Sequence, residues 1–215
     1  MTNTAQTTLQ TIKVAISTLH GMACLASVKD IRYYLNGLYI EANSTHTRVV
    51  ATDGKVLGAH DSEQENTLDK PISFIMPIEI IKLVKATYKT LDGATIALNI
   101  DDTGLVLGGT IEPFGGTTIG FKTVEGKYPQ YWRVIPSEPA SGETAQFNPE
   151  LVQKFVKTAK FMSSAKNPVP EIHHNGKNIA IIRFGVDAFV GVIMPMRTDL
   201  TPASAPTRFL TSLVA

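Results

Sequence analysis

The sequence has a single cysteine, Cys24, among its 215 residues. One thiol excludes an internal disulfide and a cysteine-rich zinc site, so a reducing compartment is the simplest expectation. No stretch approaches the roughly 18 consecutive apolar residues of a membrane-spanning helix, and the N-terminus lacks the basic start and apolar core of a signal peptide. We therefore expect a cytoplasmic protein without a membrane segment.

The chain also lacks an excess of either positive or negative charge. The chain carries 20 Lys and Arg against 19 Asp and Glu, a formal net charge of +1. This balance provides no global attraction to nucleic acid or acidic lipid. Any basic surface must therefore be local.

The common signatures of catalytic and metal sites are missing as well. The segment GGTIEPFGG has neither the spacing nor the Gly-Lys-Ser/Thr ending of a phosphate-binding loop. His173 and His174 are adjacent, so in a strand they would point to opposite faces, and no Cys or carboxylate cluster shares their spacing. There is no nucleophile elbow, Cys/His signature or HExxH. We therefore expect a protein without a catalytic site, a metal or a cofactor.

What the chain does have is a series of strand and helix patterns. Residues 8–16 predict a strand, and residues 17–27 predict a short helix capped by Ser17. The next segments are rich in β-branched and aromatic residues and are broken by Asn36-Gly37 and Asp53-Gly54, which are typical of hairpins or bulges. Further along, ISFIMP predicts a strand, IEIIKLVKATYKT an amphipathic helix, and TIALNID, GLVLGGTIE and TIGFKTV three more β segments.

This pattern starts again after a segment of linker composition near residues 137–144. MPIEIIKLVKAT from Met76 aligns with NPELVQKFVKTA from Asn148, with matching Pro, Lys and Val positions. A strand, a helix started by proline and several strands thus occur at least twice, and residues 8–60 provide a weaker third copy. Chance similarity between two amphipathic helices is the alternative. We expect an α+β fold of about three similar units.

Lysines recur on one face of both aligned helices. In an isolated helix such lysines usually form a solvated face. They also suit a surface that follows DNA phosphates, which needs local positive charge and no base-reading side chains. Repetition at matching positions favours the second interpretation modestly, and both stay open. The lysines concerned are Lys82, Lys85, Lys89, Lys154, Lys157 and Lys160.

Four separated segments resemble, in the same order, segments of the bacterial β sliding clamp, the processivity subunit of the replicative DNA polymerase. They are DIRYYLNGLYIEA, RVVATDGKVLGAH, GKYPQYWRVIP and FVGVIMPMR. The resemblance implies repeated βαβββ units whose helices line a ring and whose strands form its outer wall. It implies a middle clamp domain of two units over residues 1–137, a linker over 138–144, one unit of the last domain over 145–197, and an extended tail over 198–215.

The resemblance also implies a groove between the two domains that accepts short peptides. Methionines can line an adaptable apolar pocket, and a proline beside it limits strand pairing. Clamps usually carry His-Arg where this chain has Lys55-Val56, which leaves the peptide preference open. The implied groove residues are Leu35, Thr52, Gly54, Lys55, Val56, Leu57, Pro129, Arg133, Val134, Val192, Ile193, Met194, Pro195, Met196 and Arg197.

Clamps contact DNA partly through the loop that here reads KDIRYY. The resemblance therefore makes Lys29, Arg32, Tyr33 and Tyr34 candidate DNA contacts, since tyrosines can stack on bases and cations can pair with phosphates. In isolation the same tyrosines would be interpreted as strand aromatics in a core.

By this resemblance the chain is a replication processivity factor that binds clamp-interacting peptides of polymerases and clamp loaders. Expected partners are also DNA, bound without sequence preference, and further copies of the chain in a homo-oligomer. The sequence leaves open whether the chain encircles DNA. One rival is a decoy that cannot close a ring and competes with a host clamp for its partners; another is an enzyme accessory module unrelated to replication.

The last 18 residues need a separate explanation. TDLTPASAPT has the composition of a flexible or extended tether, and RFLTSLVA then brings apolar residues together. Three hypotheses remain for this tail: it occupies the groove in competition with partner peptides, it is a disordered terminus, or it adds a strand at a subunit contact.

Overall fold

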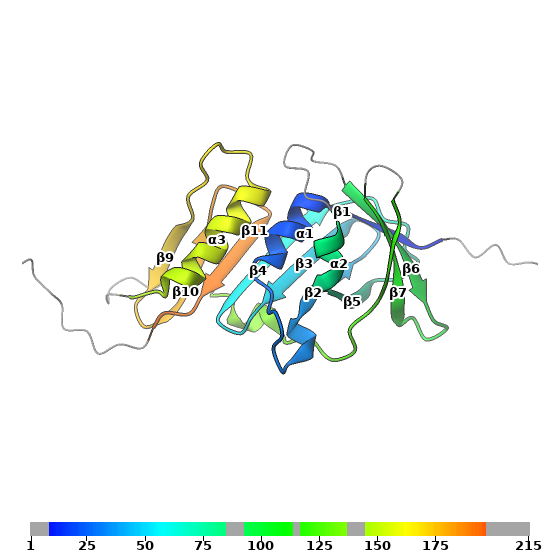
Figure 1. The fold of residues 1–215 in the computed structure, drawn as a ribbon, viewed down its shortest axis with the longest axis horizontal. Coiled ribbons are helices and arrows are strands. Elements are labelled where there is room, and N and C mark those ends of the chain that lie inside the picture. The colour runs from blue at the N-terminus through cyan, green and yellow to red at the C-terminus, as the bar shows by residue number, and fades with distance from the viewer. Residues whose placement is uncertain (1–8, 85–92, 114–116, 137–144, 197–215) are drawn as a thin grey trace, which may run out of the picture.

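The computed structural model describes residues 9–84, 93–113, 117–136 and 145–196. These residues form two antiparallel sheets with helices on one side, as Figure 1 shows. The α+β fold of repeated units predicted from the sequence is confirmed. None of the described helices is both long and apolar enough to cross a membrane.

Three units follow one another along the chain, each with a helix before three strands. The first contains β1 (Thr11–Ala15), α1 (Ile16–Ala23), β2 (Gly37–Ala42), β3 (His46–Thr52) and β4 (Val56–Glu63). The second contains β5 (Ile72–Pro77), α2 (Ile78–Leu83), β6 (Gly93–Ile100), β7 (Val106–Glu112) and β8 (Ile119–Lys122). The third contains α3 (Pro149–Met162), β9 (Glu171–Asn175), β10 (Asn178–Arg183) and β11 (Phe189–Ile193). Two short 3₁₀ turns, η1 (Tyr33–Leu35) and η2 (Tyr131–Val134), lie in the connections.

The first two units exchange strands. β1 pairs with β6 and completes a four-stranded sheet of order β1-β6-β7-β8, while β5 pairs with β2. A seven-stranded sheet of order β5-β2-β3-β4-β11-β10-β9 results because β4 also pairs with β11. The ladder between β4 and β11 thus joins the third unit to the first, with Leu57 opposite Val192.

The main core lies between the helices and the sheets, and α1 packs directly on α3. Close approach of these helices requires a small residue, since a Cβ at Gly21 would lie 2.5 Å from the Met162 side chain. Thr158 of α3 donates a hydrogen bond to the Gly21 carbonyl at 3.0 Å, which fixes the contact. Helix packing and strand pairing therefore hold the first and third units in one arrangement.

Some of the turns and helix caps predicted from the sequence agree with the structure, and others do not. Asp53-Gly54 forms the β3–β4 hairpin, with Gly54 at a φ of 88°. Asn36-Gly37 makes no hairpin, because Asn36 ends η1 and Gly37 begins β2. Ser17 is not a cap: α1 begins one residue earlier, after Ala15, and has no side-chain cap. Asn148 caps α3 instead, accepting a hydrogen bond from the Glu150 backbone N–H.

Candidate functional site

The β3–β4 hairpin forms one wall of an apolar groove. The Asp53 carboxylate accepts hydrogen bonds from the backbone N–H groups of Lys55 (2.8 Å) and Val56 (2.9 Å). Thr52 Oγ1 donates to the Val56 carbonyl at 2.6 Å and accepts from the Gly54 N–H at 3.0 Å. Because these bonds lie within the turn, the hairpin keeps its shape without a ligand.

A segment from residue 123 to residue 136 forms the opposite wall by crossing the outer face of the seven-stranded sheet. The Val124 N–H donates to the Ile75 carbonyl at 2.9 Å, and Tyr128 stacks on Tyr39 with ring centroids 4.6 Å apart. These contacts belong to a second apolar cluster, separate from the core beneath the helices. The segment thereby covers an apolar sheet surface and ends at the groove.

A polar network anchors η2 in that segment. The Tyr131 hydroxyl donates to Glu41 at 2.7 Å and accepts from Arg48 at 3.1 Å, while Arg48 also pairs with Asp61. Burial raises the pKa of Tyr131 to about 12, so the hydroxyl stays protonated at neutral pH and can donate. The Arg48–Asp61 hydrogen bond raises the pKa of the guanidinium further above its usual value.

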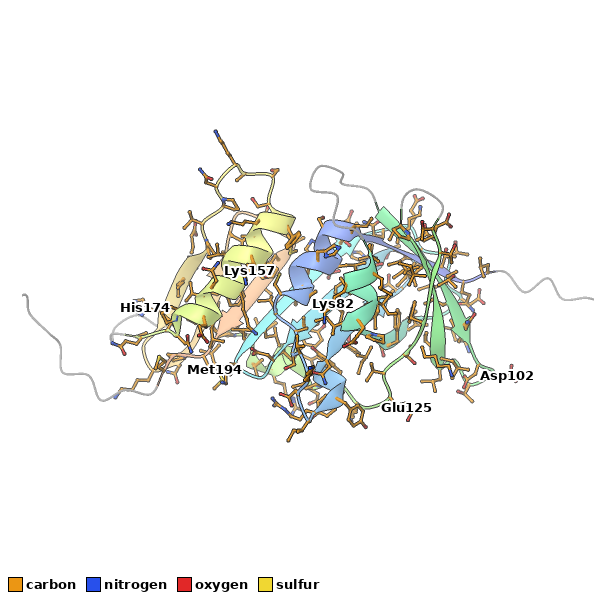
Figure 2. The ribbon with its side chains drawn as sticks, in the orientation of Figure 1. Lys82, Asp102, Glu125, Lys157, His174 and Met194 are labelled. Carbon is orange, nitrogen blue, oxygen red and sulfur yellow. The ribbon has the colours of Figure 1, made fainter. Side chains whose placement is uncertain are left out.

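The groove between these walls has a volume of about 300 Å³. The structure brings most of the residues implied by the resemblance together there: Leu35, Thr52, Gly54, Lys55, Val56, Leu57, Pro129, Val134, Val192 and Met194. Leu35, Leu57 and Val192 are buried in its floor, whereas Met194 is 48% exposed at its mouth. Figure 2 labels Met194 where the chain leaves β11.

Five implied residues stand apart from this set. Ile193 is wrongly placed by the prediction: it is fully buried in the core beneath the helices, because side chains alternate along β11 and its neighbours Val192 and Met194 take the groove side. Arg133, Pro195 and Met196 do not line the groove. Arg197 lies outside the described residues.

The groove also contains residues that sequence reasoning missed or assigned elsewhere. Arg32 and Tyr34, expected as DNA contacts, line it together with Gln130, Tyr131 and Ile179. Gln130 and Tyr131 lie inside one of the quoted clamp-like segments, so their position in the sequence next to Pro129 could have indicated that they line the groove. Nothing in the sequence marks Ile179, which reaches the groove only because β10 pairs with β11.

The KDIRYY loop is held against the groove through Arg32. Its guanidinium makes two hydrogen bonds to Asp30, at 3.0 and 2.8 Å, and one to the Asp53 carbonyl at 3.3 Å. The hydrogen bond from Arg32 lowers the pKa of Asp30 to about 2. Lys29 and Tyr33 are exposed, so they remain available for contacts beyond the loop.

The predicted lysine stripes are only partly described. Lys82 of α2 and Lys157 and Lys160 of α3 are exposed, and Figure 2 labels Lys82 and Lys157 on the side where the helices lie. Lys154 instead forms an ion pair with Asp53 at 2.6 Å, which ties α3 to the groove hairpin. Lys85 and Lys89 lie outside the described residues. No group of three or more His, Cys, Asp or Glu in the described part of the chain could hold a metal ion.

Units that exchange strands, helices on one side and a groove at the junction of two units agree with the clamp architecture that the resemblance implies. The family described as the DNA polymerase III beta subunit, central domain, matches residues 8–130. The match covers more than half of the sequence, and the chain belongs to this family.

Individual curated proteins similar to this chain are sliding clamps as well. The beta sliding clamp of Salmonella typhimurium is 31% identical over 111 residues, 52% of this chain and 28% of that protein. The beta sliding clamp of Proteus mirabilis is 29% identical over 142 residues, 64% of this chain and 35% of that protein. The chain thus matches about a third of the length of these curated relatives.

Solved structures show the same fold. A crystal structure of the DNA polymerase sliding clamp from Pseudomonas aeruginosa with ligand aligns with a TM-score of 0.66 and 19% identity, over 88% of this chain and 67% of that one. The DNA polymerase III beta subunit of Thermotoga maritima aligns with a TM-score of 0.65 and 16% identity, over 92% of this chain and 68% of that one.

Proposed function

We propose that the chain is a sliding-clamp-like processivity factor of DNA replication that binds short apolar peptides of polymerases and clamp-loader-type proteins. It acts as an accessory subunit in the cytoplasm and has no catalytic site of its own. The observation that carries the proposal is the apolar groove of about 300 Å³ at the junction of β4 and β11, lined mainly by the residues that the clamp resemblance implies.

The composition of the groove favours a peptide with apolar side chains. Its floor of Leu35, Leu57 and Val192 has no charged group, so an aliphatic or aromatic side chain inserted there loses water without leaving a buried charge unpaired. Met194 at the mouth can change rotamer to fit different side chains. Lys55 at the rim supplies positive charge that orients the peptide backbone or an acidic side chain, whereas the charge of Arg32 is paired with Asp30.

Fluorescence anisotropy with a labelled clamp-binding peptide from a bacterial replicative polymerase tests this groove. We expect micromolar affinity, equivalent to about −8 kcal/mol, and about three- to tenfold weaker binding after Met194→Ala, because apolar contact area at the groove mouth is lost. Met196→Ala is the matched control: Met196 is also 48% exposed but does not line the groove, so its removal should leave affinity unchanged. Lack of saturable binding at 1 mM peptide would refute the proposal.

We further propose that the helical side faces DNA and that several copies form a homo-oligomer around or along it. Lys82, Lys157 and Lys160 are exposed on helices of the same side, which supports contact with phosphates without sequence preference. Lys29 and Tyr33 in the exposed loop remain candidates for further contacts.

The alternative role is a decoy that competes with a host clamp for its partners without forming a ring. The groove would serve this role as well, since peptide binding to it requires no ring. Both roles predict peptide binding, and they differ in DNA binding, which only the processivity factor requires.

A further inference from the structure

The third unit repeats the strand arrangement of the first, but its described residues include no strand equivalent to β5. β2, β3 and β4 form one antiparallel series and β9, β10 and β11 another, and the two meet at the β4–β11 pair. β2 has β5 as its outer neighbour, paired from Gly37 opposite Pro77 to Ala42 opposite Ile72. Among the described residues, β9 pairs only with β10, and Figure 1 shows it at the outer end of the sheet.

Burial reflects this difference. Leu38 and Ile40 of β2 are fully buried next to β5. In β9, by contrast, Ile172 is half-buried and His173 and His174 are exposed. Polar side chains protect an exposed sheet edge from uncontrolled pairing, but the backbone groups along that edge still provide a template for another strand.

The chain itself contains a segment that resembles β5. PISFIMP at residues 71–77 aligns with PTRFLTS at residues 206–212, so that the proline, the phenylalanine and the aliphatic residue after it coincide. In β5 that phenylalanine, Phe74, faces the core beneath the helices and Ile75 faces the outer apolar cluster. The matching residues in the tail are Phe209 and Leu210.

The connection to this segment has a suitable length. Residues 64–71 lead from the end of β4, across β3 and β2, to β5. Residues 197–206 would lead from the end of the described chain, across β10 and β9, with two residues more. Three strand spacings amount to roughly 15 Å, and ten extended residues span up to about 33 Å. The crossing therefore places no strain on the chain.

We propose that residues 207–212 add to the free edge of β9 as an antiparallel strand, in the position that β5 holds beside β2. In β2 and β5, Tyr39 lies opposite Ile75 and Ile40 opposite Phe74. The same register puts Leu210 opposite His173 and Phe209 opposite His174 on the core side. The added strand closes the third unit, and a tail held there cannot occupy the peptide groove at the same time.

Hydrogen–deuterium exchange of the β9 amides tests the added strand. The full chain is compared with a chain that ends at Leu200 and with Thr211→Pro, which removes an N–H that in this register donates to β9 at Ile172, as Met76 does to Leu38 of β2. We expect β9 amides to exchange at least about tenfold faster in both variants, while β2 amides do not change. Ala203→Pro, in the connection, is the control and should match the full chain. Equal β9 exchange in the full and truncated chains would overturn the proposal.

A disulfide test establishes the register and the source of the strand. Cysteines at His173 and Leu210, in a Cys24→Ser chain, should cross-link within one chain, because side chains directly opposite in an antiparallel pair are close enough for a disulfide. Cysteines at His173 and Ser204 should not. Cross-linked dimers, or β9 protection that grows with protein concentration, would show that a second copy supplies the strand and would contradict the proposal.

Discussion

At the scale of single residues, Asp53 connects the groove to the helical side. Its carboxylate accepts from the backbone of Lys55 and Val56 in the groove hairpin and from Lys154 Nζ of α3, while its carbonyl accepts from Arg32. One side chain thus fixes the hairpin turn and ties it to a helix of another unit. Lys154 cannot leave for a DNA phosphate without breaking this contact.

Asp53 should make stability depend on pH. Burial alone would raise the pKa of its carboxyl group, but the hydrogen bonds from Lys154, Val56 and Lys55 outweigh burial and hold the pKa below 3.8. A group with a lowered folded-state pKa contributes stability that is complete above its unfolded pKa, near 3.8, and is lost as pH falls through the folded value.

The expected result is that Asp53→Asn lowers the free energy of unfolding by about 1–2 kcal/mol at pH 7, since a charge-assisted hydrogen bond is weakened. This loss should shrink as pH falls below about 4. Denaturant unfolding from pH 7 to pH 2.5 measures both. Asp102→Asn, in the exposed β6–β7 turn, is the control and should match the unaltered chain throughout. A deficit of equal size at every pH would show that the carboxylate charge plays no part.

Sequence reasoning named many of the residues that line the groove because they belong to short segments with a clamp-like order, such as TDGKVL around Leu57. It failed for Ile193, because it assigned consecutive residues at the end of a strand to the groove together. Side chains along a strand alternate between two faces, and Ile193 faces the core. Sequence reasoning also could not find the Lys154–Asp53 pair, since these residues are far apart in sequence and meet only through the β4–β11 ladder.

At the scale of elements, exposed lysines on the helices support the proposed binding of DNA. α3 is amphipathic, burying Phe155, Thr158 and Ala159 and exposing Lys157 and Lys160. α2 is short, but Lys82 in its last turn is exposed as well. A basic surface spread over two helices can bind phosphates at several points, each of which releases counterions.

We expect binding to duplex DNA to weaken steeply with salt, and the triple variant Lys82→Ala, Lys157→Ala and Lys160→Ala to flatten the slope of log K against log salt by roughly 2–3. Electrophoretic mobility or anisotropy titrations from 25 to 200 mM salt measure the slope. The control removes the same charge elsewhere: Lys13→Ala, Lys122→Ala and Lys127→Ala, all exposed and outside the helices. If both triple variants behave alike, only net charge matters and the helical surface has no special role.

Element types were largely predictable, because periodicity and β-branched content decide them locally; ISFIMP, for example, coincides with β5. The order of strands was not. Nothing local in β1 indicates that it pairs with β6, and nothing in β4 indicates a partner in β11. These pairings depend on the packing of whole units. The 3₁₀ turn η2 was not predicted either.

At the scale of the whole molecule, the three units present two different faces. The seven-stranded sheet runs through the first and third units, its inner face is covered by helices, and its outer face bears the groove. The repeat seen in the sequence predicted the units, and the family match confirms their clamp character over residues 8–130. How copies assemble depends on surfaces between chains, which a single sequence does not encode in a recognisable pattern.

Methionine methyl NMR can show whether the groove at the β4–β11 junction binds clamp-interacting peptides. Met194 lies at the groove mouth, whereas Met22 and Met76 are fully buried in the core beneath the helices. Titration with the polymerase peptide should shift the Met194 methyl signal saturably, with a midpoint in the micromolar range, and leave Met22 and Met76 unmoved. A Met194 signal that does not move with 1 mM peptide would contradict the account.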